Sequence, residues 1–286
     1  MASSALPSIM ADAVDSEQER RDFCNYENYA LPGATLSAFH ELRQSNQLID
    51  VVLITGDVEI PCHRVVLAAS SLYFKAMFTS NVEEAMQERV TLRDVNSDML
   101  QLIVDYMYTS QVRITTENVQ ELLVTANFFL LKCLVYACGN FLVRQLDVDN
   151  CVAMHGFAES QGCQELTAAA RAYAVGRFPE VAKTEGFLNA GAQLLRQYAA
   201  NESLSVRSEA ELLRALLEWL THGGDRQERQ NSFLSLVRLV RLPFVGRDCL
   251  EELGKLPAAM GIDPTGCQEL FALASACRED RTTSVP

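Results

Sequence analysis

The segment from His63 to Phe78, HRVVLAASSLYFKAMF, is rich in apolar residues and constrains the fold more than any other part of the chain. Its apolar residues predict two helical turns, over Val65–Ala69 and Leu72–Phe78. Ser70 and Ser71 between them are residue types that cap helix N-termini. A helix that is hydrophobic on every side lies in the centre of its domain. We therefore expect a strand hairpin before this segment and helices packed around it.

The residues that precede this segment have the pattern of a β-hairpin. Strand-forming residues occur over Asp50–Thr55 and Asp57–Ile60, with Gly56-Asp57 as the turn. Pro61 has no amide hydrogen, so we expect it to end the strand pairing. No constellation of serine, cysteine and carboxylate residues surrounds His63 in the sequence, and we expect a core histidine.

The remainder of the chain is predicted to be helical apart from two short strands. The strand patterns are Val90–Leu92 and the sequence YTSQVRI, from Tyr108 to Ile114. Helical periodicity predicts helices over Ser97–Tyr108, Glu117–Phe128 with Thr116 as its cap, Leu131–Gln145, Asp147–Glu159, Cys163–Val175, Gly186–Tyr198, Glu209–Thr221, Arg226–Val240 and Glu269–Cys277. Trp219 lies on an apolar helix face, and we expect it to pack in a core.

Two sets of residues carry a resemblance to a known family. Asp50-Val51-Val52-Leu53 and the run from Cys62 to Phe78, CHRVVLAASSxYFxAMF, closely resemble the BTB (POZ) domain of the kelch-like family. The later runs QLDVDNC, GFAESQGCQEL, RFPEVAKTEGFL, SEAELLRALLEWL and VRLVRLPF resemble the BACK domain that follows it. The resemblance implies an α+β BTB/POZ domain over residues 33–145 and an all-α BACK domain over residues 146–278. An acidic tail over residues 1–32, expected to be disordered, and a polar tail over residues 279–286 complete the chain.

The family resemblance also implies a binding partner. Kelch-like proteins that bind cullin-3 carry a hydrophobic-x-Glu motif in the loop that Val82, Glu83 and Glu84 occupy here. The hydrophobic residue would be an apolar anchor, and the glutamate would fix orientation by hydrogen bonds. The resemblance adds the central helix to this surface, through Tyr73, Phe74 and Phe78.

A second cullin contact is implied for the first BACK helices, over Asp147–Arg177. Phe157, Ala158 and Leu166 are the candidates there. The alternative for any one of these residues is packing in the core of the helical domain. A homodimer is implied as well, since the BTB family uses the first helix and a neighbouring aspartate in its dimer interface. The corresponding residues are Leu36, Phe39 and Leu42, at helical spacing within a helix over Thr35–Ser45, together with Asp50.

Composition and charge exclude several classes of function. The net charge of −13 argues against non-specific nucleic-acid binding, which needs a basic surface. The most apolar run, Ala126–Val143, is interrupted by Asn127, Lys132 and Asn140, so it predicts a core helix and no membrane span. The four histidines have no ligand spacing, and no phosphate-binding or hydrolase motif occurs. We therefore expect no metal, no cofactor and no enzymatic activity.

The nine cysteines form no CxxC pair and lie mostly in apolar helical runs. This pattern indicates reduced, buried thiols and a cytoplasmic location, with the nucleus as an alternative. Cys133, which follows Lys132, is the candidate for a reactive sensor thiol.

The resemblance thus implies a substrate-adaptor scaffold of a cullin-3 RING ubiquitin ligase. Its partners would be cullin-3, a second copy or a related BTB protein, and a protein substrate that the sequence does not identify. Two alternatives are a BTB scaffold outside ubiquitin ligation, in transcriptional repression or the cytoskeleton, and a propeller-less inhibitor of kelch-like adaptors. No repeat of about 50 residues with paired glycines, typical of a kelch propeller, occurs in the sequence. The chain is therefore either a piece of a longer protein or a protein without a propeller.

Overall fold

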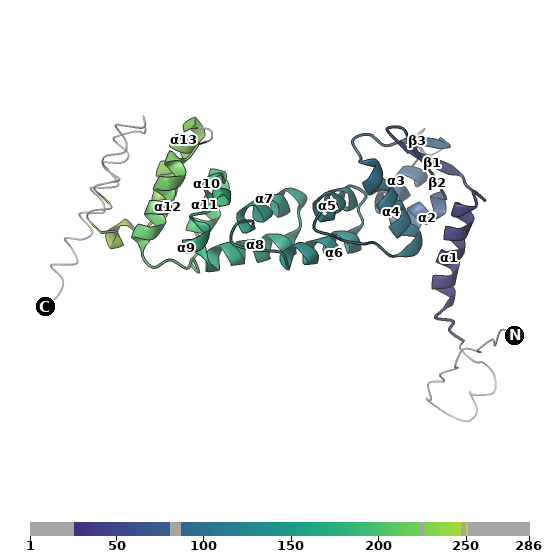
Figure 1. Ribbon diagram of the computed structural model, residues 1–286, viewed down its shortest axis with the longest axis horizontal. Coiled ribbons are helices and arrows are strands. Elements are labelled where there is room, and N and C mark those ends of the chain that lie inside the picture. Colours follow the sequence, from purple (N-terminus) through teal and green to yellow (C-terminus); the bar gives the residue numbers. More distant parts are fainter. Residues whose placement is uncertain (1–25, 81–86, 224–225, 247–249, 251–286) are drawn as a thin grey trace, which may run out of the picture.

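The computed structural model describes residues 26–80, 87–223, 226–246 and 250. The Val82-Glu83-Glu84 motif, the helix expected over Glu269–Cys277 and both predicted tails, except for residues 26–32, lie outside the described residues. Within these ranges a small sheet with its surrounding helices is followed by a row of helices, and the whole is elongated (Figure 1).

The sheet has three strands in the order β2-β1-β3. Strands β1 (Val51–Thr55) and β2 (Val58–Cys62) form the expected antiparallel hairpin, and β3 (Arg89–Thr91) pairs parallel to β1. Gly56 at the turn has φ +54°, a conformation that glycine adopts without strain. Alternate residues of the hairpin, such as Leu53 and Ile60, face the core.

Pro61 does not end the strand pairing, contrary to expectation. It pairs with Val52 inside β2, which is an edge strand. The carbonyl oxygen of Pro61 faces away from β1 and accepts a hydrogen bond from Arg43 Nε at 3.0 Å. A residue whose backbone polar groups face outward from an edge strand needs no amide hydrogen for the ladder.

The central segment forms two helices, α2 (Arg64–Ser70) and α3 (Leu72–Thr79). Ser71 caps α3, since its Oγ accepts a hydrogen bond from the amide of Phe74 at 3.2 Å. The expected burial on every side is wrong, because Val65 is 60% exposed and Leu72 is 55% exposed. Both helices are short, and each covers the domain core with one face only.

The remaining helices of the first domain surround this segment. They are α1 (Leu31–Gln44), α4 (Ser97–Thr109), α5 (Val119–Phe128) and α6 (Lys132–Val143). The residues from Gln111 to Ile114 form no strand. The predicted cap of α5 is also wrong: the helix begins after Asn118, whose side chain donates to Arg113 O at 2.9 Å and accepts from the amide of Thr115.

His63 is buried as expected, accepting at Nδ1 from the Tyr108 hydroxyl and donating from Nε2 to Gln47 O, both at 2.9 Å.

From Cys151 onward the described chain is helical, as predicted. Its helices are α7 (Cys151–Gln161), α8 (Gln164–Gly176), α9 (Phe178–Val181), α10 (Glu185–Leu188), α11 (Ala192–Ala199), α12 (Glu209–Thr221) and α13 (Arg226–Val237), followed by a 3₁₀ turn, η3 (Leu242–Phe244). The sequence predicts a single helix over Gly186–Tyr198, but the structure has two, α10 and α11. Residues 189–191 between them are not helical. The carbonyl oxygen of Ala190 in this break accepts from the buried indole of Trp219 at 2.8 Å, which confirms the core position of that residue.

The helix pair α7–α8 belongs to two hydrophobic cores. Ala158 and Leu166 pack in the core of the sheet and its helices. Cys151, Val152 and Ala174 pack in the core of the later helices. Helix α8 lies against α6, and Figure 1 shows α5–α8 between the sheet domain and α9–α13. The two cores are thus joined through packed helices.

The contact between α6 and α8 depends on glycine. A Cβ at Gly139 would lie 2.9 Å from the Sγ of Cys163, which is closer than carbon and sulfur approach without a shift. We expect Gly139→Ala to lower the free energy of unfolding by ~1–3 kcal/mol in denaturant titrations. Gly156→Ala is the matched control, because Gly156 lies inside α7 with nothing within 4 Å of its would-be Cβ. That change should leave stability unchanged or raise it by ~1 kcal/mol. Equal stability of the Gly139→Ala variant and the unmodified chain would contradict the tight contact.

Candidate protein-binding surface

An aromatic cluster joins α3 to the C-terminal end of α5. The ring of Phe74 stacks on that of Phe129 with centroids 5.1 Å apart, and both residues are fully buried. Tyr73 lies 5.1 Å from Phe128 and 5.3 Å from Phe129. Phe128 is 48% exposed, and Tyr73 is partly exposed. The cluster therefore has a buried base and an aromatic face toward solvent.

A hydrogen bond holds the two parts of this cluster together. The buried Ser71 hydroxyl donates to the carbonyl oxygen of Phe129 at 2.7 Å while it caps α3. The start of α3 and the end of α5 are thus fixed to each other by one side chain.

A hydrogen bond joins the end of α5 to the end of α7. The side-chain amide of Asn127, at the end of α5, donates to the carbonyl oxygen of Gln161, the last residue of α7, at 2.9 Å. Phe157 on α7 is partly exposed and packs against the first core. We name the three solvent-accessible rings near this junction, Tyr73, Phe128 and Phe157, the aromatic surface.

The predicted partner-contact residues divide into two groups. Tyr73, Phe78 and Phe157 are partly exposed and available at the surface. Phe74, Ala158 and Leu166 are fully buried, so they support the surface from behind and do not line it. The physical reason is helical phase: each of the three occupies the core side of its helix. Phe128 was not among the predicted contact residues. The sequence does show an aromatic pair, Phe128-Phe129, at the end of a predicted helix.

Arg64 connects the aromatic cluster to the β-hairpin. Its guanidinium lies over the ring of Phe78, 5.1 Å from the centroid, and donates from Nη2 to the carbonyl oxygen of Gln87 at 2.6 Å. The backbone amide of Arg64 donates to the Asp50 carboxylate at 2.7 Å. Asp50, expected at a dimer interface, is exposed and positions Arg64.

The predicted dimer residues of α1 share one side of that helix. Leu36, Phe39 and Leu42 are all partly buried, and Phe39 packs edge-on against His63 at 5.7 Å. One part of each side chain therefore contacts its own domain, and the rest is open to a partner.

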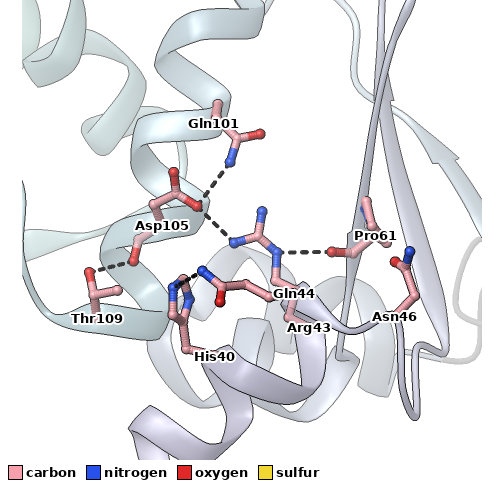
Figure 2. A pocket seen from close by; sticks show the side chains of 8 residues that line it. All are labelled: His40, Arg43, Gln44, Asn46, Pro61, Gln101, Asp105 and Thr109. Atoms are coloured by element: carbon pink, nitrogen blue, oxygen red, sulfur yellow. Dashed lines mark hydrogen bonds and ion pairs between the residues drawn. The ribbon is translucent and has the colours of Figure 1, made fainter.

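A polar pocket lies beside these residues, between α1, β2 and α4 (Figure 2). Arg43 lies in its middle, with Nη1 2.8 Å from Asp105 Oδ1 and Nε on Pro61 O. Gln101 donates to the same Asp105 oxygen at 2.9 Å. Because Arg43 and Asp105 neutralise each other, the arrangement fixes α1 to the sheet and offers no activated base or nucleophile.

The cysteine thiols of the described residues do not form a catalytic set. Burial raises the pKa of Cys62 and of Cys138 to about 12, and that of Cys151 to about 11. Such thiols stay protonated at neutral pH and are poor nucleophiles. Cys133 is exposed on α6, whereas Cys163 is buried.

In the described part of the chain no cluster of metal-ligating side chains occurs, and no helix has the length and hydropathy to span a bilayer.

Two protein-family models match this chain. The family model "BTB/POZ domain" matches residues 39–146, and the model "BTB And C-terminal Kelch" (BACK) matches residues 151–255.

Three curated relatives illustrate the similarity. Mouse Kelch-like protein 2 is 38% identical over 211 residues, which are 74% of this chain and 35% of the relative. Mouse Kelch-like protein 3 is 36% identical over 244 residues, 85% of this chain and 41% of the relative. Human Kelch-like protein 17 is 39% identical over 213 residues, 74% of this chain and 33% of the relative. The chain thus spans well under half the length of these proteins.

The matches confirm the predicted fold class, an α+β BTB domain followed by an all-helical BACK domain. The chain belongs to the kelch-like BTB–BACK proteins.

Proposed function

We propose that this kelch-like chain is a substrate adaptor of a cullin-3 RING ubiquitin ligase. It binds the N-terminal region of cullin-3 through the BTB domain and the first BACK helices, and it forms a homodimer through the BTB domain. The observation that supports this best is the aromatic surface, because side chains from both domains, Tyr73, Phe128 and Phe157, contribute to it.

The composition of this surface suits protein binding. A phenylalanine that is half exposed beside a partly exposed tyrosine costs solvation free energy in the isolated chain. Aromatic side chains of this kind supply much of the binding free energy when a partner buries them. The buried stack of Phe74 on Phe129 keeps the surface rigid, so that little conformational entropy is lost on binding.

The Val82-Glu83-Glu84 motif supports the same partner. The motif follows α3 in the sequence. Gln87, the first described residue after it, accepts a hydrogen bond from Arg64, whose guanidinium also lies over the ring of Phe78. In the proposed complex the motif adds its apolar residue and its glutamate to the contact, as the family resemblance implies.

The mechanism of such an adaptor is positional. It carries out no bond chemistry, and it holds a protein substrate near the ubiquitin-loaded enzyme that the cullin recruits. Tethering raises the effective concentration of substrate, and a dimer presents two such sites.

The aromatic surface can be tested by removing one ring. We expect Phe128→Ala to weaken binding of the cullin-3 N-terminal region by at least tenfold, about 1.4 kcal/mol, in a calorimetric titration. Phe244→Ala is the matched control, since Phe244 has a similar exposure, 56%, and lies in η3 at the far end of the BACK domain. It should bind as the unmodified chain does. Equal affinity of the two variants would exclude the aromatic surface, and no binding by the folded, unmodified chain would exclude the cullin-3 adaptor.

The proposed dimer is tested on α1. We expect Leu36→Arg to shift the chain from dimer to monomer in sedimentation velocity, because a charge would be buried in an apolar interface. Ser37→Arg adds the same charge at an exposed position of the same helix and should leave the dimer intact. A monomeric unmodified chain at micromolar concentration would refute the dimer.

A further inference from the structure

A polar pair joins two helices inside the BACK domain. His155 on α7 is fully buried, and its Nδ1 lies 2.8 Å from the hydroxyl oxygen of Tyr198 on α11. Tyr198 is itself buried in the BACK core. Along α7, His155 lies between Val152, which packs in the BACK core, and Ala158, which packs in the BTB core. An ionisable ring is therefore enclosed in the helix that the two cores share.

The second ring nitrogen of His155 has no such partner. Among the described residues none forms a hydrogen bond with Nε2, which is also shielded from solvent. The carboxylate of Glu159, one turn further along α7, lies on this side of the ring, with Oε1 3.9 Å from Nε2. That distance is too long for a hydrogen bond, and the same oxygen accepts from Gln197 Nε2 of α11 at 2.7 Å. The carboxylate favours a proton on Nε2 in the neutral ring, so that Nδ1 accepts from the Tyr198 hydroxyl.

The surroundings of the ring favour its neutral form. Burial lowers the pKa of His155 and outweighs the Glu159 carboxylate, which raises it. Arg171 on α8, the helix that packs along α7, lowers the pKa of His155 further. The neutral ring is therefore the form that fits the folded BACK domain at neutral pH.

The other titratable groups near the pair do not supply a partner for a charged ring. Burial raises the pKa of Tyr198, and Cys151 and Glu159 add to that effect, so the hydroxyl keeps its proton at neutral pH. Helix α10 also packs against α7, and its acidic residue, Glu185, has its carboxylate 3.2 Å from the ring of His222.

We propose that the His155–Tyr198 pair is a pH-sensitive joint between α7 and α11, closed while the imidazole is neutral and opened when mild acid protonates it. Protonation places a hydrogen on Nδ1, which then no longer accepts from the Tyr198 hydroxyl. The new charge is fully buried, and a buried charge without a hydrogen-bonded counter-charge is costly. Separation of α7 from α11 lets water reach the ring and removes this cost.

The joint has a consequence for the surface of the BACK domain. Helix α7 carries Phe157, the BACK ring of the aromatic surface, and its last residue, Gln161, binds Asn127 of the BTB domain. Opening of the joint therefore loosens the helix that connects the two domains. The inference does not depend on the proposed cullin contact.

Linkage fixes the sign of the effect. An unfolded histidine has a pKa of about 6.5, and the pKa of His155 is lower in the fold, so the stability that the neutral ring contributes is present above that pH and lost below it. At about pH 5.5 an unfolded histidine is protonated about ten to one, so the unfolding equilibrium constant can rise by about tenfold.

Denaturant titrations followed by the fluorescence of Trp219 measure this rise. Trp219 is the only tryptophan of the chain and lies in the BACK core. From about pH 7.5 to about pH 5.5 the unfolding equilibrium constant should rise at least about threefold more in the unmodified chain than in His155→Gln, whose amide does not titrate. His222→Gln is the matched control, because His222 is a partly exposed histidine of the same domain, and it should keep the full rise. An equal rise in the unmodified chain and in His155→Gln would overturn the joint.

Two measurements on the unmodified chain keep the proposal testable if His155→Gln does not fold. The chain has four histidines, and nitrogen NMR of the imidazoles should show the ring of His155 titrating below about 6.5. Titration at or above that value would mean that the protonated ring stays in place and pairs with Glu159, which overturns the proposal.

Hydrogen exchange, corrected for its intrinsic pH dependence, locates the effect. Residues 151–161 of α7 and 192–199 of α11 should lose at least about threefold in protection at about pH 5.5, and residues 97–109 of α4 should lose less. An equal loss in all three helices would place the acid sensitivity outside the joint and overturn the proposal.

Discussion

The close approach of α6 and α8 is the contact on which the rest of the structure depends. Gly139 permits it, because any side chain there would collide with the Sγ of Cys163. Through this contact α7 and α8 place Ala158 and Leu166 in the BTB core, while Cys151 and Val152 pack in the BACK core. The end of α7 then lies beside the end of α5, where Asn127 binds Gln161. A BTB helix and a BACK helix are therefore held end to end at this point.

Much of the fold could be predicted from the sequence, because periodicity and turn chemistry are local. The hairpin around Gly56, α4, α12 and the buried positions of His63 and Trp219 all agree with the sequence analysis. Two of the predictions were wrong because of the tertiary surroundings. Pro61 stays in a strand because β2 is an edge, and the break between α10 and α11 offers the Ala190 carbonyl to a distant indole.

The candidate site was less predictable than the fold. Sequence resemblance selected α3 and the first BACK helices, but it did not separate residues that face solvent from those behind them. Phe74 and Tyr73 are neighbours in sequence, yet one is fully buried and the other partly exposed. Phe128 was missed because the exposure of a side chain is a property of the folded chain.

The function that we propose is protein recognition. Burial raises the pKa of the Cys62, Cys138 and Cys151 thiols, and Arg43 and Asp105 neutralise each other in their pocket. We therefore expect the binding free energy to come from burial of solvent-exposed aromatic and aliphatic side chains. The Ser71 hydrogen bond and the Phe74–Phe129 stack hold the helices that carry them in place.

Hydrogen exchange of the chain with and without the cullin-3 N-terminal region tests the central claim most directly. A single surface built from α3, α5 and α7 predicts slower exchange on binding in three separate segments at once, residues 72–80, 124–131 and 154–161. Exchange in α12, at the far end of the BACK domain, should be unchanged. Protection confined to one of the three segments, or found mainly in α12, would contradict the account.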